Sequence, residues 1–231
     1  MGAFMLDRCI ITYIFGNNNE ILREPAVYSP DIQYICVTDQ SNLQSEIWDV
    51  VVDVMPSILN PRDKISYVKY NPFKYTTASH VCVIDGSMQI TGQMETLFNS
   101  LQQCDLLVKR HPEAANLLSE INRWITIRSM PVAILNIFKA MALYDHIDLS
   151  ADFLIESCIL GYTRSDNILQ LCQMVIKYME FIGQAAGIQM CPTNQCVLTY
   201  LIEKTHTKFQ YIDQGKYVTR YQHGSWILNN H

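Results

Sequence analysis

The segment Val81-Cys82-Val83-Ile84-Asp85-Gly86-Ser87 indicates the fold of the whole chain, because an apolar run leads directly into a polar turn. Comparable short apolar runs, each followed by polar or turn-forming residues, occur at 8–15, 32–38, 48–54 and 106–108. Such runs are typical of strands that are buried on both faces of a parallel sheet. Because ligands of these sheets bind beyond the carboxyl ends of the strands, the polar residues after each run are the first candidates for a site.

Helix-like stretches separate these runs, so an α/β architecture is expected. In the first half, residues 62–70 and 92–102 have helical patterns, and Pro61 suits a first helical turn. The second half has a strand-like run at 153–161 and an aromatic, extended tail at 208–231. Its helices are expected at 113–127, 132–144, 165–181 and 193–203. We therefore predict a central, mainly parallel sheet flanked by helices, with a helical second half, in one domain.

The composition of the 231-residue chain narrows the classes of function. With 49% hydrophobic and 17% charged residues it can bury a sizeable core, and no run approaches the ~20 apolar residues of a membrane span. The formal charge of −5 disfavours a protein that coats nucleic-acid phosphates. The eight cysteines contain no C-x-x-C pair, and the N-terminus lacks a secretory pattern. We expect a cytoplasmic protein in a reducing compartment, with peripheral membrane contact left open.

Asp85-Gly86-Ser87 is the sharpest local feature, since a strand delivers a carboxylate to its own end. A lone carboxylate and a hydroxyl can hold Mg²⁺ or Mn²⁺ only in part, so that water and substrate phosphates would have to complete the coordination. The alternative is a structural turn in which Asp85 accepts hydrogen bonds from backbone N–H groups. The local sequence leaves both interpretations open.

Positive charge gathers near two expected strand ends. Arg62, Lys64 and Lys69 share the helix before the strand at 81–84, where they could bind a diphosphate or form a solvated helix face. The segment Lys-Arg-His-Pro at 109–112 follows another strand and suits a binding role or a surface turn equally well. A local basic site for one phosphorylated molecule is therefore compatible with an acidic chain.

The absence of several motifs excludes common chemistries. There is no G-x-G-x-x-G after the first run, no G-x-x-x-x-G-K-[ST] and no G-x-S-x-G, which disfavours a dinucleotide oxidoreductase, a P-loop ATPase and an α/β-hydrolase. The six histidines show no zinc-binding spacing. His223, in the aromatic tail, could be a late metal or phosphate ligand or an ordinary surface histidine.

Short motifs follow one another along the chain at 13–16, 34–39 with 48–50, 61–64 with Lys69, 83–90, 109–112, Glu120, 154–156, 161–164 and 193–195. Their order resembles that of a nucleotide-sugar glycosyltransferase of the GT-A type. More narrowly, it is similar to a glycosyltransferase-like family of bacterial polysaccharide clusters and plants, whose marker is a strand ending in W-I-D-G-S. The resemblance extends over roughly residues 8–205, and the order and spacing of the motifs are its specific part.

The resemblance implies a GT-A-like, Rossmann-like fold that binds a nucleoside-diphosphate sugar, most of all a UDP-sugar. It implies one domain over 1–231, with a nucleotide-binding part at 1–110 and acceptor-side helices and a tail at 111–231. Enzymes of this type usually carry Asp-x-Asp at the strand end, where it holds the metal that bridges the diphosphate. Here Ser87 replaces the second Asp, and 193–195 reads Thr-Asn-Gln where the family more often has an Asp before Gln.

The resemblance also implies roles for individual residues. The nucleoside and the diphosphate would be bound by Tyr13, Phe15, Gly16, Asp39, Arg62, Lys64, Lys69, Asp85 and Gly86. Contacts to the sugar or the acceptor would come from Ser87, His111 and Gln195. The divalent metal, Mn²⁺ or Mg²⁺, would be held by Asp85, Ser87 and His223. The general base of an inverting reaction would be Glu156 or Asp152, while the stereochemistry stays open.

The function expected on this basis is hexosyltransferase-like transfer of a sugar to a hydroxyl of a glycan or a lipid-linked acceptor in polysaccharide biosynthesis. The rival is a non-catalytic protein on the same fold that binds a sugar nucleotide or a glycan, which the missing second Asp favours. A phosphohydrolase would need a dense cluster of carboxylates at the strand ends, and the sequence does not supply one.

Overall fold

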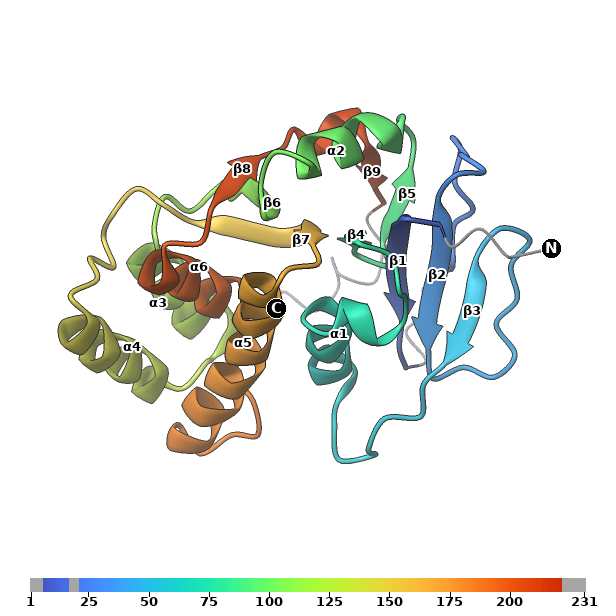
Figure 1. Ribbon diagram of the computed structural model, residues 1–231. Coiled ribbons are helices and arrows are strands. Elements are labelled where there is room, and N and C mark those ends of the chain that lie inside the picture. The colour runs from blue at the N-terminus through green and yellow to red at the C-terminus, as the bar shows by residue number, and fades with distance from the viewer. Residues whose placement is uncertain (1–5, 17–20, 222–231) are drawn as a thin grey trace.

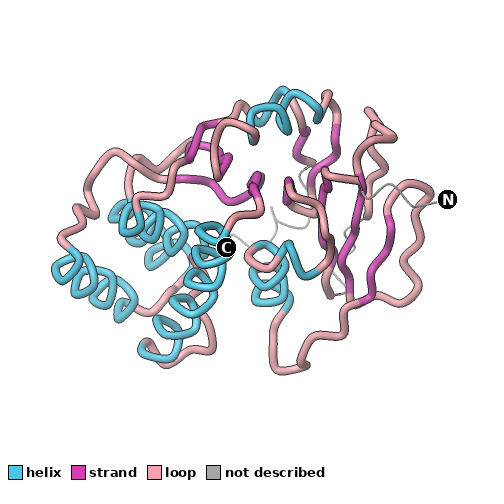
Figure 2. Tube along the Cα trace, in the orientation of Figure 1, coloured by secondary structure: helices cyan, strands magenta, loops and turns pink. Residues whose placement is uncertain are grey.

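The computed structural model describes residues 6–16 and 21–221, whose arrangement is drawn in Figures 1 and 2. A seven-stranded sheet runs through the molecule in the order β3-β2-β1-β4-β7-β6-β8. Four strands of the first half pair in parallel, namely β1 (Arg8–Ile14), β2 (Gln33–Thr38), β3 (Asp49–Val52) and β4 (His80–Ile84). β1, β2 and β4 are buried along nearly all of their length, as their near-continuous apolar runs predict.

The second half of the chain completes the same sheet. β7 (Ile155–Thr163) lies between β4 and β6 (Leu106–Arg110) and runs antiparallel to both, while β8 (Phe209–Tyr211) pairs in parallel with β6. The prediction of a mainly parallel sheet flanked by helices is confirmed, with β7 as an antiparallel member. Phe153 was expected inside this strand but precedes it, and its ring stacks on Phe209 with 5.2 Å between the ring centroids.

Helices and a small second sheet cover the two faces of the large sheet (Figure 1). One core includes residues of α1 (Pro61–Lys69), α3 (Leu117–Arg128), α4 (Val132–Asp145), α5 (Asp166–Ala185) and α6 (Asn194–Thr205). The other core includes α2 (Met94–Leu101) and the two-stranded sheet of β5 (Met88–Ile90) and β9 (Val218–Arg220). Within the described ranges, none of the helices combines the length and the apolar character that crossing a bilayer requires.

Polar side chains define where helices α1 and α3 begin. The side chain of Asn60 accepts a hydrogen bond from the N–H of Asp63 (3.0 Å), which places Pro61 in the first turn of α1. Asn116 and Ser119 form a capping box, so α3 starts at Leu117 and not at 113. The intervening residues instead form a turn in which His111 Nδ1 accepts the N–H groups of Glu113 and Ala114.

The cysteines serve as core residues. All eight lie within the described ranges and carry free thiols, and seven of them are buried. Burial raises the pKa of Cys9 to about 12 and that of Cys158 to about 12, so these thiols stay protonated at neutral pH. A protonated, buried thiol behaves as a small apolar side chain, in keeping with the apolar runs in which these cysteines stand.

The described part of the C-terminal tail returns to the middle of the chain. A short 3₁₀ turn at Gln214–Lys216 leads into β9, which pairs antiparallel with β5 so that Arg220 lies opposite Met88. Beyond the strand, the N–H of Tyr221 donates to the carbonyl oxygen of Ser87 (2.9 Å). Because β5 directly follows the turn at 85–87, this pairing brings Arg220 to the end of β4.

Gly92 permits this return because two backbone segments pass very close together. A Cβ atom at position 92 would lie 1.8 Å from the carbonyl oxygen of Lys216. Gly92→Ala is therefore expected to displace 214–217 and to lower the free energy of unfolding by ~1–3 kcal/mol, as overpacking does. Urea unfolding followed by circular dichroism measures this loss.

Gly215→Ala is the matched control on the same segment. Its Cβ would meet Asp213 Oδ1 at 3.5 Å, which is an ordinary contact. This variant should unfold within ~0.5 kcal/mol of the unmodified protein. If the two variants were equally stable, the proposed close packing of Gly92 against Lys216 would be contradicted.

Candidate active site

A cavity of about 650 Å³ opens where the carboxyl ends of β1 and β4 meet α1, α3 and the start of α6. This is where ligands of α/β sheets are generally found. The first half of the chain supplies Tyr13, Phe15, Asn60, Pro61, Arg62, Ile65, Lys69, Asp85, Gly86 and Ser87. The second half supplies Trp124, Arg128, Ser157, Pro192, Thr193, Asn194 and Gln195.

Asp85 is the central charge of the cavity wall. Its Oδ1 accepts a hydrogen bond from the hydroxyl of Tyr13 and forms an ion pair with Lys69 Nζ at 2.8 Å. Its Oδ2 lies 3.7 Å from the guanidinium of Arg220. The turn that follows the strand is closed by the backbone, because the N–H of Met88 donates to the carbonyl oxygen of Asp85 (2.9 Å). The carboxylate therefore binds side chains of three other elements.

Lys69 is buried, and its ammonium is held from two sides. Besides Asp85, it donates to the carbonyl oxygen of Ser157 on β7 at 2.7 Å. The hydroxyl of Ser157 donates to Asn194 Oδ1 (2.7 Å), and Asn194 Nδ2 donates to the hydroxyl of Ser66 (3.1 Å). Ser66 lies one turn before Lys69 on α1, so this chain of hydrogen bonds ties α1, β7 and α6 together around the ammonium.

A second carboxylate, Glu156 on β7, is held by two cations. Lys109 on β6 binds one of its oxygens, and Arg220 binds Oε1 at 2.9 Å. Burial alone would raise the pKa of Glu156, but the hydrogen bond from Lys109 and the charges of Arg220 and Lys109 lower the pKa below the usual glutamate range. Glu156 is therefore ionised at neutral pH. Arg220 links it to Asp85.

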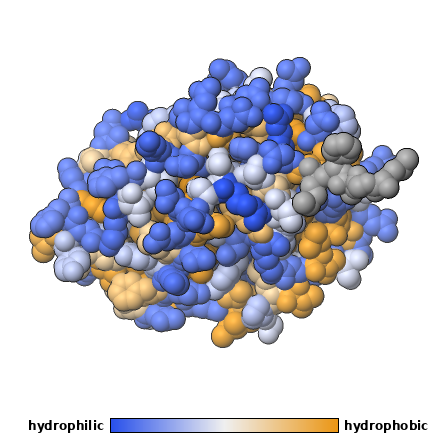
Figure 3. Space-filling view, viewed as in Figure 1, coloured by the Kyte–Doolittle hydropathy of each residue, from blue (hydrophilic) through white to orange (hydrophobic). Residues whose placement is uncertain are grey.

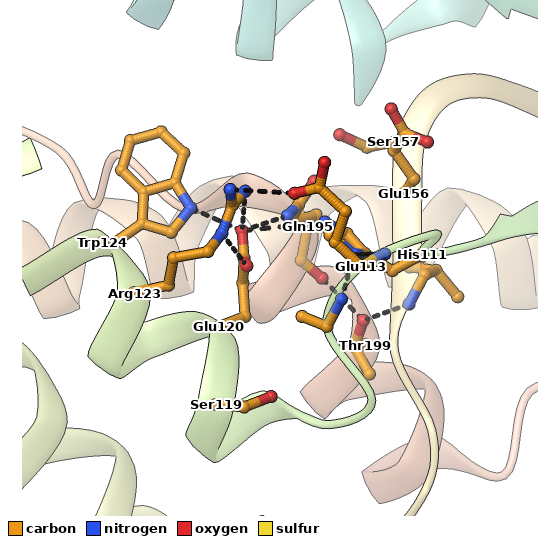
Figure 4. Close-up of polar contacts among 12 residues, drawn as sticks. His111, Glu113, Ser119, Glu120, Arg123, Trp124, Glu156, Ser157, Gln195 and Thr199 are labelled. Carbon is orange, nitrogen blue, oxygen red and sulfur yellow. Dashed lines mark hydrogen bonds and ion pairs between the residues drawn. The ribbon is translucent and has the colours of Figure 1, made fainter. Parts of the chain in front are cut away.

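Glu120 on α3 is fully buried and collects donors from three side chains (Figure 4). Its oxygens accept hydrogen bonds from Trp124 Nε1 (2.6 Å), Gln195 Nε2 (2.7 Å) and Arg123 Nε (2.9 Å). His111 Nε2 lies 3.8 Å from the same carboxylate. This cluster fixes Trp124 and Gln195, which both line the cavity.

His111, which was expected to contact the sugar or the acceptor, lies outside the lining of the cavity. Burial lowers the pKa of His111, and the nearby charge of Glu120 opposes this only in part. Its ring is therefore neutral at physiological pH, with Nδ1 accepting backbone N–H groups. The ring adjoins Glu120, and Glu120 accepts a hydrogen bond from the lining residue Gln195.

Arg62 and Trp124 stack on each other in the lining of the cavity. The guanidinium of Arg62 stacks over the indole ring, with 4.5 Å between Cζ and the ring centroid. The two residues come from α1 and α3, so the stack joins the two halves of the chain across the opening. The cavity thus combines fixed cations with aromatic surface.

Three of the residues expected to bind the nucleoside lie beside the cavity. The N–H of Gly16, which has a positive φ of 75°, donates to Asp39 Oδ1 (3.0 Å), and Lys64 Nζ binds Asp39 Oδ2 (2.8 Å). Burial would raise the pKa of Asp39, but the bonds from Lys64 and Gly16 lower it. A Cβ on Gly16 would lie 3.1 Å from Pro61, which lines the cavity.

The structure places the remaining candidates differently. Asp152 precedes β7 in an exposed loop, where it pairs with the exposed Arg110 at 2.8 Å, and it does not line the cavity. Glu156 is next to the lining residue Ser157 but is itself bound to Lys109 and Arg220. His223 lies outside the described residues, so its expected role as a metal ligand stays a prediction.

The atoms around Asp85 do not fit a divalent cation. Oδ1 already accepts two donors, Oδ2 faces Arg220, and Ser87 offers only a neutral hydroxyl. Over residues 6–16 and 21–221, no group of three or more His, Cys, Asp or Glu side chains could hold a metal ion. Two unit charges 4 Å apart interact by about 4 kcal/mol at an effective dielectric constant near 20. A doubly charged ion beside two cations would therefore be strongly repelled.

The site residues that sequence reasoning missed include Arg220, Trp124, Asn194, Ser157 and Arg128. Glu120 and Trp124 stand four residues apart on a predicted helix, so a shared face was a signal that could have been used. Asn194 was read only as part of a degenerate motif. Arg220 had no local signal, because the pairing of β5 with β9 alone brings it to Asp85.

Removing the buried carboxylate tests the wall that holds Trp124 and Gln195. Glu120→Ala would leave Arg123, Trp124 and Gln195 without their shared acceptor, and we expect it to lower the free energy of unfolding by ~3 kcal/mol. Glu113→Ala is the control, since Glu113 is exposed and binds Arg123 at 3.1 Å. It should cost less than ~1 kcal/mol in chemical denaturation. Equal, small losses in both variants would contradict this role of Glu120.

Comparison with known proteins shows the fold and leaves the family open. No family model and no curated protein matches the sequence. Among solved structures, mouse xyloside xylosyltransferase 1 in its apo form is similar, with a TM-score of 0.51 and 9% identity over 90% of this chain and 85% of that chain. Together with the sheet order, this similarity shows that the chain has a GT-A-like fold.

Proposed function

We propose that this protein is a glycosyltransferase that moves a sugar from a nucleoside-diphosphate sugar, most of all a UDP-sugar, to a hydroxyl group of an acceptor. The observation that carries the proposal is the cavity at the strand ends of a GT-A-like sheet, lined by cations and aromatic rings together. Cations suit a diphosphate, and aromatic rings suit a base or a sugar. The mouse protein of similar fold is, by its name, a xylosyltransferase.

The difficult part of such a transfer is the negative charge that builds on the departing diphosphate. Lys69 and Arg62 line the cavity, and Arg220 reaches Asp85 at its wall. Lys69 is held by Asp85 and Ser157, so its charge needs little reorganisation when a donor binds. A cation fixed in advance stabilises developing charge better than a freely moving one.

The nucleoside would occupy the end of the cavity at β1. Phe15 and Tyr13 line that end, and Gly16, Asp39 and Lys64 adjoin it through Pro61. The sugar and the acceptor would then lie toward Ser87, Gly86 and Gln195. This orientation leaves the diphosphate beside Lys69 and Arg62, between the two ends.

We propose Glu156 as the general base that accepts the proton of the acceptor hydroxyl. It shares Arg220 with Asp85, whereas Asp152 is exposed and pairs with Arg110. Glu156 is ionised, as a base must be, but Lys109 and Arg220 both hold it. Acting as a base would require at least one of these cations to turn toward the diphosphate when the donor binds.

The acceptor side of the proposal is a glycan or a lipid-linked acceptor in polysaccharide biosynthesis, used by a cytoplasmic enzyme. Residues 1–110 would bind the donor, and 111–231 would supply the acceptor wall, to which Trp124, Asn194 and Gln195 belong. A peripheral membrane contact would suit Leu143 and Tyr144, which are 80% and 84% exposed on α4. On the face drawn in Figure 3, apolar residues are interspersed among hydrophilic ones.

A second candidate is a non-catalytic protein that binds a sugar nucleotide or a glycan in the same cavity. Two observations favour it: Ser87 stands where an acidic residue is usual, and both nearby carboxylates are engaged by cations. The two candidates share the binding site and differ in whether the bond to the sugar is broken.

Nucleotide binding tests the site that both candidates share. Isothermal titration calorimetry with UDP, GDP and CDP is carried out in buffer with Mn²⁺ and in buffer with EDTA. We expect UDP to bind, and Arg62→Ala to weaken binding about tenfold, because one charge-assisted contact is worth ~1.5 kcal/mol. Arg110→Ala, on the exposed pair with Asp152, should leave the affinity unchanged. No binding of any nucleotide in either buffer would refute the proposal.

Release of UDP separates transfer from binding alone. A thermal-shift screen of nucleotide sugars first selects the donor, and free UDP is then measured after incubation with the protein. We expect slow release without an acceptor, since water reaches an open cavity, and none from heat-denatured protein. If a stabilising donor binds but no UDP is ever released, the non-catalytic candidate is correct.

A further inference from the structure

We infer that the protein neutralises the diphosphate with its own cations and without a divalent metal, and that Asp85 serves to position Lys69. This inference rests on the proposed function and deepens it, because it concerns how the same cavity holds the same leaving group. It departs from the expectation that Asp85, Ser87 and His223 hold Mn²⁺ or Mg²⁺.

Lys69 binds one of the two carboxylate oxygens that Asp85 could offer to a metal. Its Nζ lies 2.8 Å from Asp85 Oδ1 and 2.7 Å from the carbonyl oxygen of Ser157, and its side chain is only 6% exposed. An ammonium has three N–H donors, and these two short contacts use two of them. The third contact, 3.4 Å to the hydroxyl of Ser157, is the longest, and we expect a phosphate oxygen to replace it.

The surroundings of Lys69 keep it in this place. Ser157 is bonded to Asn194, and Asn194 is bonded to Ser66, one turn from Lys69 on the same helix. On the other side, the hydroxyl of Tyr13 donates to the oxygen of Asp85 that binds Lys69. Asp85 therefore makes a fixed site for the ammonium, which is a positioning role that requires no metal.

The charge balance of the cavity calls for an anion. Ion pairs connect Lys69, Lys109 and Arg220 with Asp85 and Glu156, which leaves this group with one positive charge in excess. Arg62 and Arg128 on the lining add further positive charge. A nucleoside diphosphate would offset this excess, whereas a divalent cation would increase it. The hydroxyl of Ser87, in place of a carboxylate, adds no negative charge.

UDP binding in the absence of metal is the direct test. The full chain is titrated calorimetrically with UDP in metal-free buffer with EDTA and in buffer with Mn²⁺, and we expect dissociation constants within twofold of each other. Lys69→Met should weaken binding at least tenfold in both buffers. Lys204→Met is the matched control, because Lys204 also binds a carboxylate, Asp145, that accepts a hydrogen bond from a tyrosine. It lies outside the cavity lining, so its UDP affinity should not change.

Asp85→Asn tests whether Asp85 positions Lys69 or binds a metal. It also provides a second test if Lys69→Met does not fold. The inference predicts that this variant weakens UDP binding by the same factor with EDTA and with Mn²⁺, because Lys69 loses its charged anchor. Electron paramagnetic resonance of added Mn²⁺ should show the same weak binding to the variant and to the unmodified protein.

These experiments distinguish failure of the metal-free inference from failure of the proposed function. UDP that binds at least tenfold more tightly with Mn²⁺, with that gain lost in Asp85→Asn, would overturn the inference and leave the proposed function standing. An unchanged UDP affinity in both Lys69→Met and Asp85→Asn would also overturn it. Failure of UDP, GDP and CDP to bind in either buffer would refute the proposed function itself.

Discussion

The ion pair between Lys69 and Asp85 is the contact on which the rest of the site depends. It joins the end of α1 to the end of β4, and Tyr13 of β1 donates to the same carboxylate oxygen. The side chain of Lys69 is nearly buried, and an ammonium or a carboxylate left unpaired in such a place would be costly. Each partner therefore requires the other, and together they fix the distance between helix and strand that shapes the cavity.

Residues from the second half of the chain hold this ion pair in position. β7 offers the carbonyl oxygen of Ser157 to Lys69, and its neighbour Glu156 receives Arg220 from the last described strand. Glu120 likewise holds two lining residues in position, because it accepts hydrogen bonds from Trp124 and Gln195. The lining of the cavity is thus held by buried polar contacts, which makes it a preformed site whose charges point to an anionic ligand.

Local pattern accounted for much of this arrangement. The apolar runs predicted the buried strands β1, β2 and β4. Tyr13 and Phe15, at the end of the first run, lie in one cavity with Asp85, Gly86 and Ser87, which end and follow the run at 81–84. Arg62 and Lys69, on the helix that precedes the strand at 81–84, also line the cavity, and their role in binding a diphosphate stays a prediction. His111 and Asp152 were predicted to lie in the site, but neither lines the cavity. The His111 side chain is buried beside Glu120, whereas Asp152 is exposed. Burial depends on distant neighbours, which the local sequence does not reveal.

The sequence by itself determined most of the elements: strands from apolar runs, the start of a helix at Pro61, and a carboxylate at the end of a strand. These features depend on interactions between residues a few positions apart. Only the tertiary structure decided that β7 runs antiparallel to its neighbours and that β9 brings Arg220 to Asp85. It also decided that Lys69 forms its ion pair with Oδ1 of Asp85. Such contacts join distant residues, and their free energy comes from pairing and burial that exist only once the sheet has formed.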